Sequence, residues 1–186
     1  MLLKHNDRVK TLRQRLRMMT ESGRAPNEHH DDLKAITQEI SNTIRILDHK
    51  LAEDRYTCGM HALGLEKSED YAAIAGHGLG LVYAGRDFFE WIIAKQQLNE
   101  VTGASDGDLV MYFSQGRWTH IGRLMGPERA VSKWGVGLLY EHDLPEVPEQ
   151  YGDEVRFFCH PGPDASLDLF VLYAKARGVE FEYENR

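Results

Sequence analysis

Two residues of this chain have side chains that can form and break covalent bonds together, Cys58 and His120. A cysteine thiolate is a strong nucleophile, and an imidazole can hold the proton that the thiol releases. The sequence therefore predicts, as its sharpest hypothesis, a thiol and imidazole pair capable of acyl chemistry at neutral pH. The elements around the two residues must bring them together.

A short helix is expected over residues 56–65, with Cys58 at its start. Thr57 is a good N-cap residue, and Gly64 is suited to the helix end. The free N–H groups of a first helical turn lower the pKa of a thiol, and a neighbouring imidazolium lowers it further, so we expect a cysteine that readily forms a thiolate. The competing interpretation is that Cys58 is a small buried hydrophobic residue.

An alternating strand is expected from 118 to 124. The alternation would put four side chains on one face, namely Trp118, His120, Gly122 and Leu124. His120 would then lie among apolar or small neighbours, with room beside it at Gly122. The competing interpretation is a core histidine that hydrogen-bonds to the backbone.

Length and composition exclude several classes of protein. A chain of 186 residues with 42% hydrophobic residues is enough for about one domain core, and a net charge of −7 opposes binding to nucleic acid. The N-terminus lacks the apolar run of a secretory signal, and no stretch is long and apolar enough to cross a bilayer. We therefore expect a soluble cytoplasmic protein without a nucleic-acid or membrane partner.

Neither a metal nor a cofactor is expected. Cys58 and Cys159 form no Cys-x-x-Cys motif, and Cys58-Gly-Met-His61 together with a distant His120 lacks a fourth ligand. The glycine-rich stretch 76–80 lacks the Lys-Ser/Thr of a phosphate-binding loop. We interpret it as a loop or a tight helix contact.

The first part of the chain, 1–54, has the pattern of two amphipathic helices around a break at 22–27. Gly23 is expected to end the first helix, and Asn27 or Asp31 to begin the second. The apolar positions recur at steps of three and four: Val9, Leu12, Leu16 and Met19, then Leu33, Ile36, Ile40, Ile44, Leu47 and Leu51. This predicts a helical hairpin that is a structural arm, or an arm for dimerisation or for another protein partner.

The remaining part, 55–186, reads as an α+β domain. A helix is expected over 87–101 and another over 166–177, the latter capped by Asp164 or Ser166. Short β-rich segments are expected at 109–113, 118–124, 129–134, 138–141, 155–159 and 179–183. Helices followed by an antiparallel sheet are typical of the α+β class.

The motifs between residues 56 and 135 resemble a known enzyme superfamily. Gly107-Asp108-Leu109-Val110 with Phe113, followed by His120-Ile121-Gly122, resembles the NlpC-type and CHAP-type cysteine peptidases and amidases. The resemblance implies a papain-like fold in which a cysteine at a helix start precedes a histidine on a strand.

A closer likeness runs to about residue 158. It is to a bacterial family of small uncharacterised domains that share four motifs, found here as His120 to Arg123, Ser132-Lys133-Trp134-Gly135, His142 and Tyr151-Gly152. That family brings no established reaction with it.

A third residue that would orient the imidazole is less clear. The spacing in NlpC-type peptidases falls on Ser132, whose hydroxyl orients an imidazole only weakly, and His142 is the second candidate. Glu141, on the same following strand as His142, is a further candidate. Lys133 is unsuitable, because a cation beside His120 opposes formation of the imidazolium.

The sequence thus predicts a papain-like, NlpC-related cysteine hydrolase or transferase that acts on an amide bond of a peptide or protein. Cys58 would be the nucleophile and His120 the base, with Ser132 or His142 fixing the ring. The alternative is a papain-like binding or regulatory module without turnover, with the hairpin of 1–54 as a partner-binding or oligomerisation arm.

Overall fold

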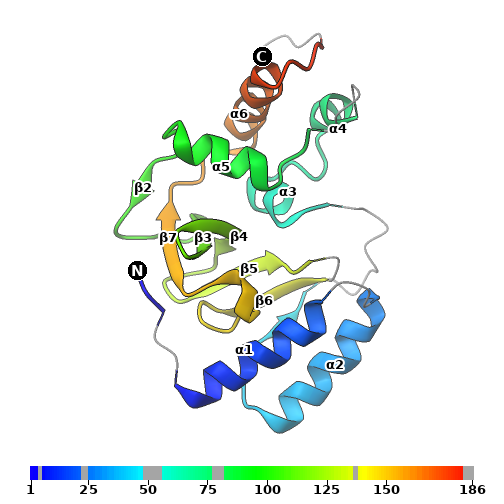
Figure 1. Ribbon diagram of the computed structural model, residues 1–186, viewed down its shortest axis with the longest axis vertical. Coiled ribbons are helices and arrows are strands. Elements are labelled where there is room, and N and C mark those ends of the chain that lie inside the picture. Colours follow the sequence, from blue (N-terminus) through cyan, green and yellow to red (C-terminus); the bar gives the residue numbers. More distant parts are fainter. Residues whose placement is uncertain (4–5, 22–24, 48–55, 77–81, 136–137, 182–186) are drawn as a thin grey trace.

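The computed structural model describes residues 1–3, 6–21, 25–47, 56–76, 82–135 and 138–181 (Figure 1). Its helices are α1 (Asp7–Thr20), α2 (Pro26–Glu39), α3 (Cys58–Leu63), α4 (Glu69–Ala75), α5 (Arg86–Ala94), the 3-10 turn η1 (Glu149–Tyr151) and α6 (Pro163–Ala176). Its strands are β1 (Arg45–Ile46), β2 (Glu100–Val101), β3 (Leu109–Ser114), β4 (Arg117–Leu124), β5 (Arg129–Lys133), β6 (Leu139–Asp143) and β7 (Glu154–Phe158).

These strands form one antiparallel sheet in the order β1-β6-β5-β4-β3-β7-β2 within the described residues. Helices α1 and α2 cover one face of the sheet, and α3 to α6 cover the other (Figure 1). The expected α+β class is confirmed.

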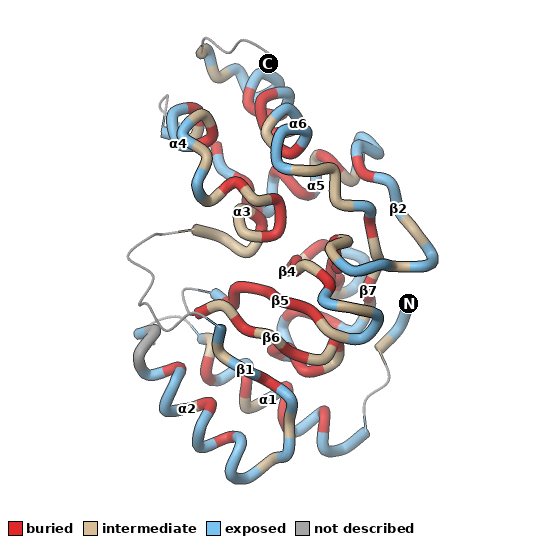
Figure 2. The backbone as a smooth tube through the Cα atoms, turned by 180° about the vertical axis from the view of Figure 1, so that it is seen from behind, coloured by how far each residue is buried: buried red, intermediate tan, exposed pale blue. Residues whose placement is uncertain are grey.

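Each face of the sheet carries its own apolar core. Alternate residues of β3 point to opposite faces, so Leu109 and Met111 pack with α3 to α6, whereas Val110 and Tyr112 pack with α1 and α2. We call these the α3–α6 core and the α1–α2 core. The central strands are buried over most of their length, whereas the outer sides of α1 and α2 are exposed (Figure 2).

The α1–α2 core joins the N-terminal helices to the sheet. Leu12 and Leu16 of α1 and Ile36 of α2 are buried in it beside strand residues. The expected hairpin therefore packs its apolar face against the rest of the chain. The boundary expected at residues 54 and 55, like Gly23, falls outside the described residues.

The second helix is shorter than its apolar repeat predicts. It begins at Pro26, where the N–H of Ala25 donates to the Glu28 carboxylate at 2.6 Å, so neither Asn27 nor Asp31 is its cap. It ends at Glu39, and β1 then pairs with β6. Ile44 still reaches the core from extended backbone, which explains why spacing alone was misleading.

Helix α5 also ends earlier than predicted. Gln96 adopts φ +51°, and the N–H groups of Gln96 and Gln97 donate to the carbonyls of Ile93 and Ile92. This is a Schellman motif, in which the left-handed residue is usually glycine. Because glutamine occupies that position here, the sequence did not predict this helix end. The remaining predicted residues form a loop and the short strand β2.

Two further helices differ from expectation. Helix α4 was not predicted from the sequence, and its cap is the Ser68 hydroxyl, which accepts from the Tyr71 N–H at 3.1 Å. Helix α6 begins at Pro163, ahead of the predicted caps, and the Ser166 hydroxyl donates to the Gly162 carbonyl instead. Residues 179–181 are not in a strand, and 182–183 lie outside the described residues.

Strand β4 contains a bulge that changes which side chains share a face. Tyr112 of β3 pairs with His120, but Phe113 pairs with Trp118, so Thr119 is an extra residue. Trp118 therefore turns into the α3–α6 core, where it stacks on Phe89 at 4.4 Å. The prediction that Trp118 and His120 share a face is wrong.

Candidate functional site

Cys58 is the first residue of α3, as the sequence predicted. The Thr57 hydroxyl accepts from the Met60 N–H at 3.1 Å and donates to the Ala84 carbonyl at 2.8 Å, which ties the helix start to the segment before α5. Gly59 allows this close approach, because a Cβ there would lie 2.5 Å from the Ala84 carbonyl oxygen. The half-buried Cys58 is thus held in place by its neighbours on both sides.

The thiol faces the edge of β4 where β5 has separated from it. The two strands pair only at Arg123 with Val131 and at Leu124 with Ala130, and α3 contacts both strands. The N–H of Met125 donates across this edge to the carbonyl of Arg129. Alternate N–H groups of a strand point to the same side. The N–H of Ile121 therefore points to the same edge, and it interacts there with the Cys58 sulfur.

The electrostatics of the thiol are the reverse of those predicted. Burial raises the pKa of Cys58 to about 11, and this effect exceeds the opposing contributions of backbone N–H groups, led by that of Ile121, and of the Lys133 cation. Helix α3 has only six residues, so the field of its first turn cannot offset the loss of water. The resting cysteine is a neutral thiol at neutral pH, and the expectation of a lowered pKa is wrong.

His120 directs its ring to the α1–α2 side of the sheet and is 1% exposed. The ring stacks on Tyr151 with centroids 3.9 Å apart and an interplanar angle of 7°. Its Nε2 atom is buried and has no hydrogen-bond partner among the described residues. Burial, and secondly the charge of His142, hold the pKa of His120 well below its usual range.

Ser132 and His142 are bonded to each other. The Ser132 Oγ lies 2.8 Å from the Nε2 of His142, and it also accepts from the Trp134 indole N–H at 2.9 Å. The Nδ1 of His142 lies 3.0 Å from the carbonyl of Asp143, which assigns the proton to Nδ1 and makes Nε2 the acceptor of the Ser132 hydroxyl proton. Burial lowers the pKa of His142 to about 4.

Three of the four predicted site residues, His120, Ser132 and His142, lie on the α1–α2 side of the sheet, whereas Cys58 packs against the α3–α6 core and reaches only the edge of β4. The sulfur of Cys58 lies against the N–H of Ile121, the residue that follows His120, and the charge of His142 acts on His120. Gly122 lets β5 approach, because a Cβ there would lie 2.9 Å from the Cβ of Ser132. The Ser132 hydroxyl donates its proton to His142 and not to His120.

Two further residues of this region were not singled out for the site from the sequence. Lys133 is 3% exposed, its Nζ lies 4.8 Å from the ring centroid of Tyr56, and its positive charge lowers the pKa of Cys58. Tyr151 stacks on His120. Both belong to motifs visible in the sequence, but the distance between two residues along the chain does not predict whether their rings stack.

The other histidines and cysteine have separate surroundings. His61 lies 3.8 Å from the Glu66 carboxylate, and His160 lies 2.9 Å from the carbonyl of Ala62. Both cysteines of the chain are described and are free thiols, and Cys159 is exposed. Within the described part, no three His, Cys, Asp or Glu side chains are grouped to hold a metal ion.

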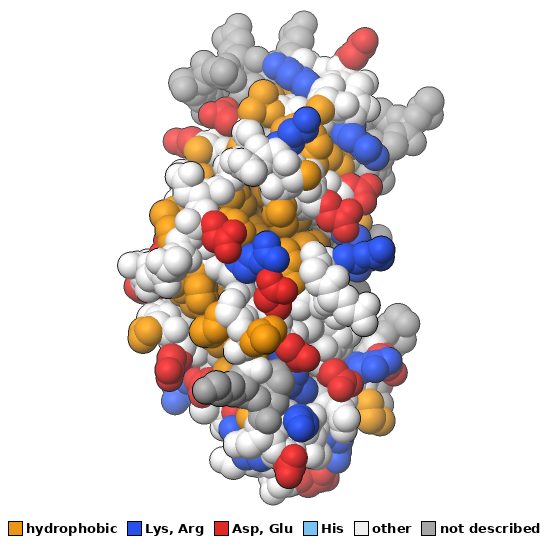
Figure 3. All heavy atoms as spheres, turned by 60° about the vertical axis from the view of Figure 1, so that its left-hand side comes forward, with side chains coloured by type: hydrophobic (Ala, Val, Ile, Leu, Met, Phe, Trp, Pro, Cys, Tyr) orange, Lys and Arg blue, Asp and Glu red, His pale blue; other side chains and the backbone are white. Residues whose placement is uncertain are grey.

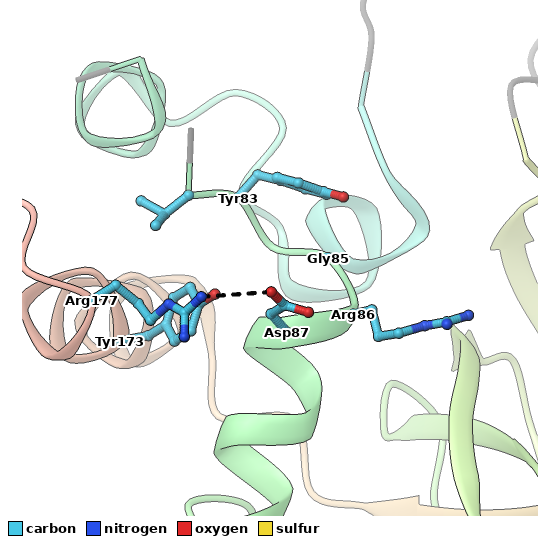
Figure 4. Close-up of a pocket in the computed structure, with 7 residues that line it drawn as sticks. Tyr83, Gly85, Arg86, Asp87, Tyr173 and Arg177 are labelled. Atoms are coloured by element: carbon cyan, nitrogen blue, oxygen red, sulfur yellow. Dashed lines mark ion pairs between the residues drawn. The ribbon is translucent and has the colours of Figure 1, made fainter. Parts of the chain in front are cut away.

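A pocket of about 260 Å³ lies at the start of α5 and is lined by none of the predicted site residues (Figure 4). Its charged groups include Asp87 and Arg177, which pair with each other at 3.8 Å, while Arg86 points away from that pair. Hydrophobic side chains are also exposed over the middle of the face shown in Figure 3.

None of the helices in the described ranges is long and apolar enough to cross a membrane.

Comparisons of the chain with models of known protein families, with curated proteins and with solved structures found no match.

Proposed function

We propose that this protein is a cysteine-dependent hydrolase or transferase of papain-like, NlpC-related type that acts on an amide bond of a peptide or protein. One observation carries the proposal. The half-buried thiol of Cys58 interacts with the backbone N–H of Ile121, and the residue before Ile121 is a buried His120 whose Nε2 has no partner among the described residues. A buried ring nitrogen without a bond is suited to a proton that arrives only during reaction.

The proposed reaction has three steps, namely attack by sulfur, loss of the amine and release of the acyl group. The sulfur of Cys58 forms a bond to the carbonyl carbon while its proton passes to the ring of His120, and the carbonyl oxygen takes the negative charge. Collapse of this intermediate breaks the carbon–nitrogen bond, and the imidazolium gives its proton to the leaving amine. Water, or an acceptor amine in a transferase, then releases the acyl group from sulfur with His120 again as the base.

The surroundings of the thiol favour negative charge that develops during the reaction. The N–H of Cys58 at the helix start can donate to the oxyanion, and the cation of Lys133 lowers the energy of an anion in this region. Both resting partners are neutral, so His120 acts as a general base at the moment of attack and not as half of a standing ion pair.

Acylation by p-nitrophenyl acetate tests the proposal. The test uses a Cys159→Ser chain so that Cys58 is the remaining thiol, and it follows p-nitrophenol release and the intact mass. We expect release of more than one p-nitrophenol per chain, an acetyl group on the Cys58 sulfur, and a loss of about 100-fold or more in His120→Gln. Cys58→Ser is the matched inactive control, and a thermal melt checks that each variant is folded.

The second candidate is a papain-like binding or regulatory module without turnover. The raised pKa of Cys58 favours this function. The hydroxyl of Ser132 favours it too, because it bonds to His142, so His120 has no hydrogen-bonded orienting group among the described residues. In that case Cys58 is acetylated at most once, at a rate that His120→Gln does not change. The same assay therefore decides between the two functions.

A further inference from the structure

We propose that Tyr151 is the positioning residue for His120, and that Arg13 of α1 holds Tyr151 in place. The inference deepens the proposed function, since it names the group that orients the proposed base. It assigns to ring stacking the task that the sequence had assigned to a hydrogen bond from Ser132 or His142.

The geometry of the stack defines the plane of the imidazole. The rings of His120 and Tyr151 are nearly parallel at 3.9 Å, and Tyr112 lies on the same side of the sheet with its ring centroid 5.7 Å from that of His120. A ring that is stacked on one aromatic side chain and packed near another cannot tilt without losing contact with the stacked ring. Stacking thus opposes rotation of the His120 ring about its Cβ–Cγ bond, because that rotation would tilt the ring out of the stack.

Tyr151 is itself fixed by the backbone around it. Its carbonyl accepts from the Thr119 hydroxyl at 2.5 Å, so the bulge residue next to His120 holds the chain that carries the stacking ring. Gly152 follows with φ +88°, and a Cβ there would lie 2.1 Å from the carbonyl oxygen of Phe113. Only glycine allows the chain to pass this close to β3.

Arg13 connects this segment to the N-terminal helices. Its guanidinium donates to the carbonyl of Gly152 at 2.7 Å and to those of Pro145 at 3.3 Å and Glu149 at 3.4 Å, and it pairs with the exposed Asp153 at 3.2 Å. Arg13 is 2% exposed. A buried fork that donates to three carbonyls holds the loop before β7 in one conformation. Helix α1 therefore contributes to the site from the side of the sheet on which the His120 ring lies.

NMR of the full chain with labelled histidines tests the inference independently of turnover. The Cε1–H signal of His120, identified by its loss in His120→Gln, is compared in Tyr151→Phe and Tyr151→Leu. We expect the signal and its pH titration to be kept in Tyr151→Phe, because the ring remains. In Tyr151→Leu the signal moves towards that of an unstacked histidine, and its titration midpoint rises because water reaches the ring.

The matched control is Phe170→Leu, which removes a buried ring from the α3–α6 core and is expected to leave the His120 signal unchanged. Arg13→Lys is expected to shift the signal in the direction of Tyr151→Leu. Ester turnover should fall about 100-fold in Tyr151→Leu and less than about twofold in Tyr151→Phe.

Two results would overturn the inference: an unchanged His120 signal in Tyr151→Leu, or a Tyr151→Phe chain that behaves like Tyr151→Leu. If the parent chain shows no ester turnover, the proposed function fails, while the NMR comparison still decides whether Tyr151 positions the ring.

Discussion

The most direct test of the electrostatics is the rate at which iodoacetamide alkylates Cys58 as a function of pH. The pKa of about 11 means that about 0.1% of Cys58 is thiolate at pH 8, against about 24% for an ordinary cysteine with a pKa of about 8.5. That is a deficit of about 200-fold in thiolate. A thiolate of higher pKa is intrinsically more nucleophilic, by about tenfold over this interval. Cys58 should therefore react about 20-fold more slowly than a cysteine in a short unstructured peptide.

The assay follows alkylation of the Cys159→Ser chain by intact mass between pH 6 and pH 10. The rate should rise about tenfold per pH unit throughout this range, because the thiol stays below its pKa. Unfolding the chain in guanidinium chloride should restore the rate of the peptide, and adding Cys58→Ser to this chain should remove the alkylated thiol. Faster alkylation of folded Cys58 than of the peptide at pH 7 would refute the reasoning, since it requires a stabilised thiolate.

Three other outcomes are expected. Lys133→Met removes a cation that lowers the pKa of Cys58, so alkylation at pH 8 should slow further, and an unchanged rate would show that the charge does not reach the thiol. Gly122→Ala places a Cβ 2.8 Å from the carbonyl oxygen of Val131 and should lower the free energy of unfolding by about 1–3 kcal/mol in denaturant titration. His142 has a folded pKa of about 4, below its unfolded value of about 6.5, so its contribution to stability is complete above pH 6.5 and is lost as the pH falls to 4. The loss is about 3 kcal/mol for this residue, and His142→Gln should flatten the decline of the unfolding free energy over that range.

Much of the secondary structure could be predicted because its signals are local. Thr57 and Gly64 bracket α3, and β3 to β7 follow apolar runs between turn residues. Where the predictions were wrong, a long-range contact or an unusual backbone decided the outcome. The repeat of α2 continues to Leu51, but the Thr43 N–H donates to the buried Glu146 carboxylate at 2.7 Å, which keeps the chain extended.

The site could be predicted in its residue types but not in its electrostatics. Cys58 at a helix start and His120 on a strand are readable from neighbouring residues. The bulge at Thr119 is not, because it depends on how β4 pairs with β3, and it sends Trp118 and His120 to opposite faces. Stacking on Tyr151 depends likewise on a turn 31 residues further along the chain.

The sequence by itself determined that a helix begins at Cys58, roughly where β3 to β7 lie, and which side chains carry reactive groups, since these follow from backbone preferences and periodicity within a few residues. Only the tertiary structure decided that the thiol is neutral, that Ser132 serves His142, and that a tyrosine faces the imidazole. Charge state and orientation depend on how much water the surrounding side chains exclude and on which partners they supply. Those surroundings are assembled from segments far apart in the chain, so no local pattern records them.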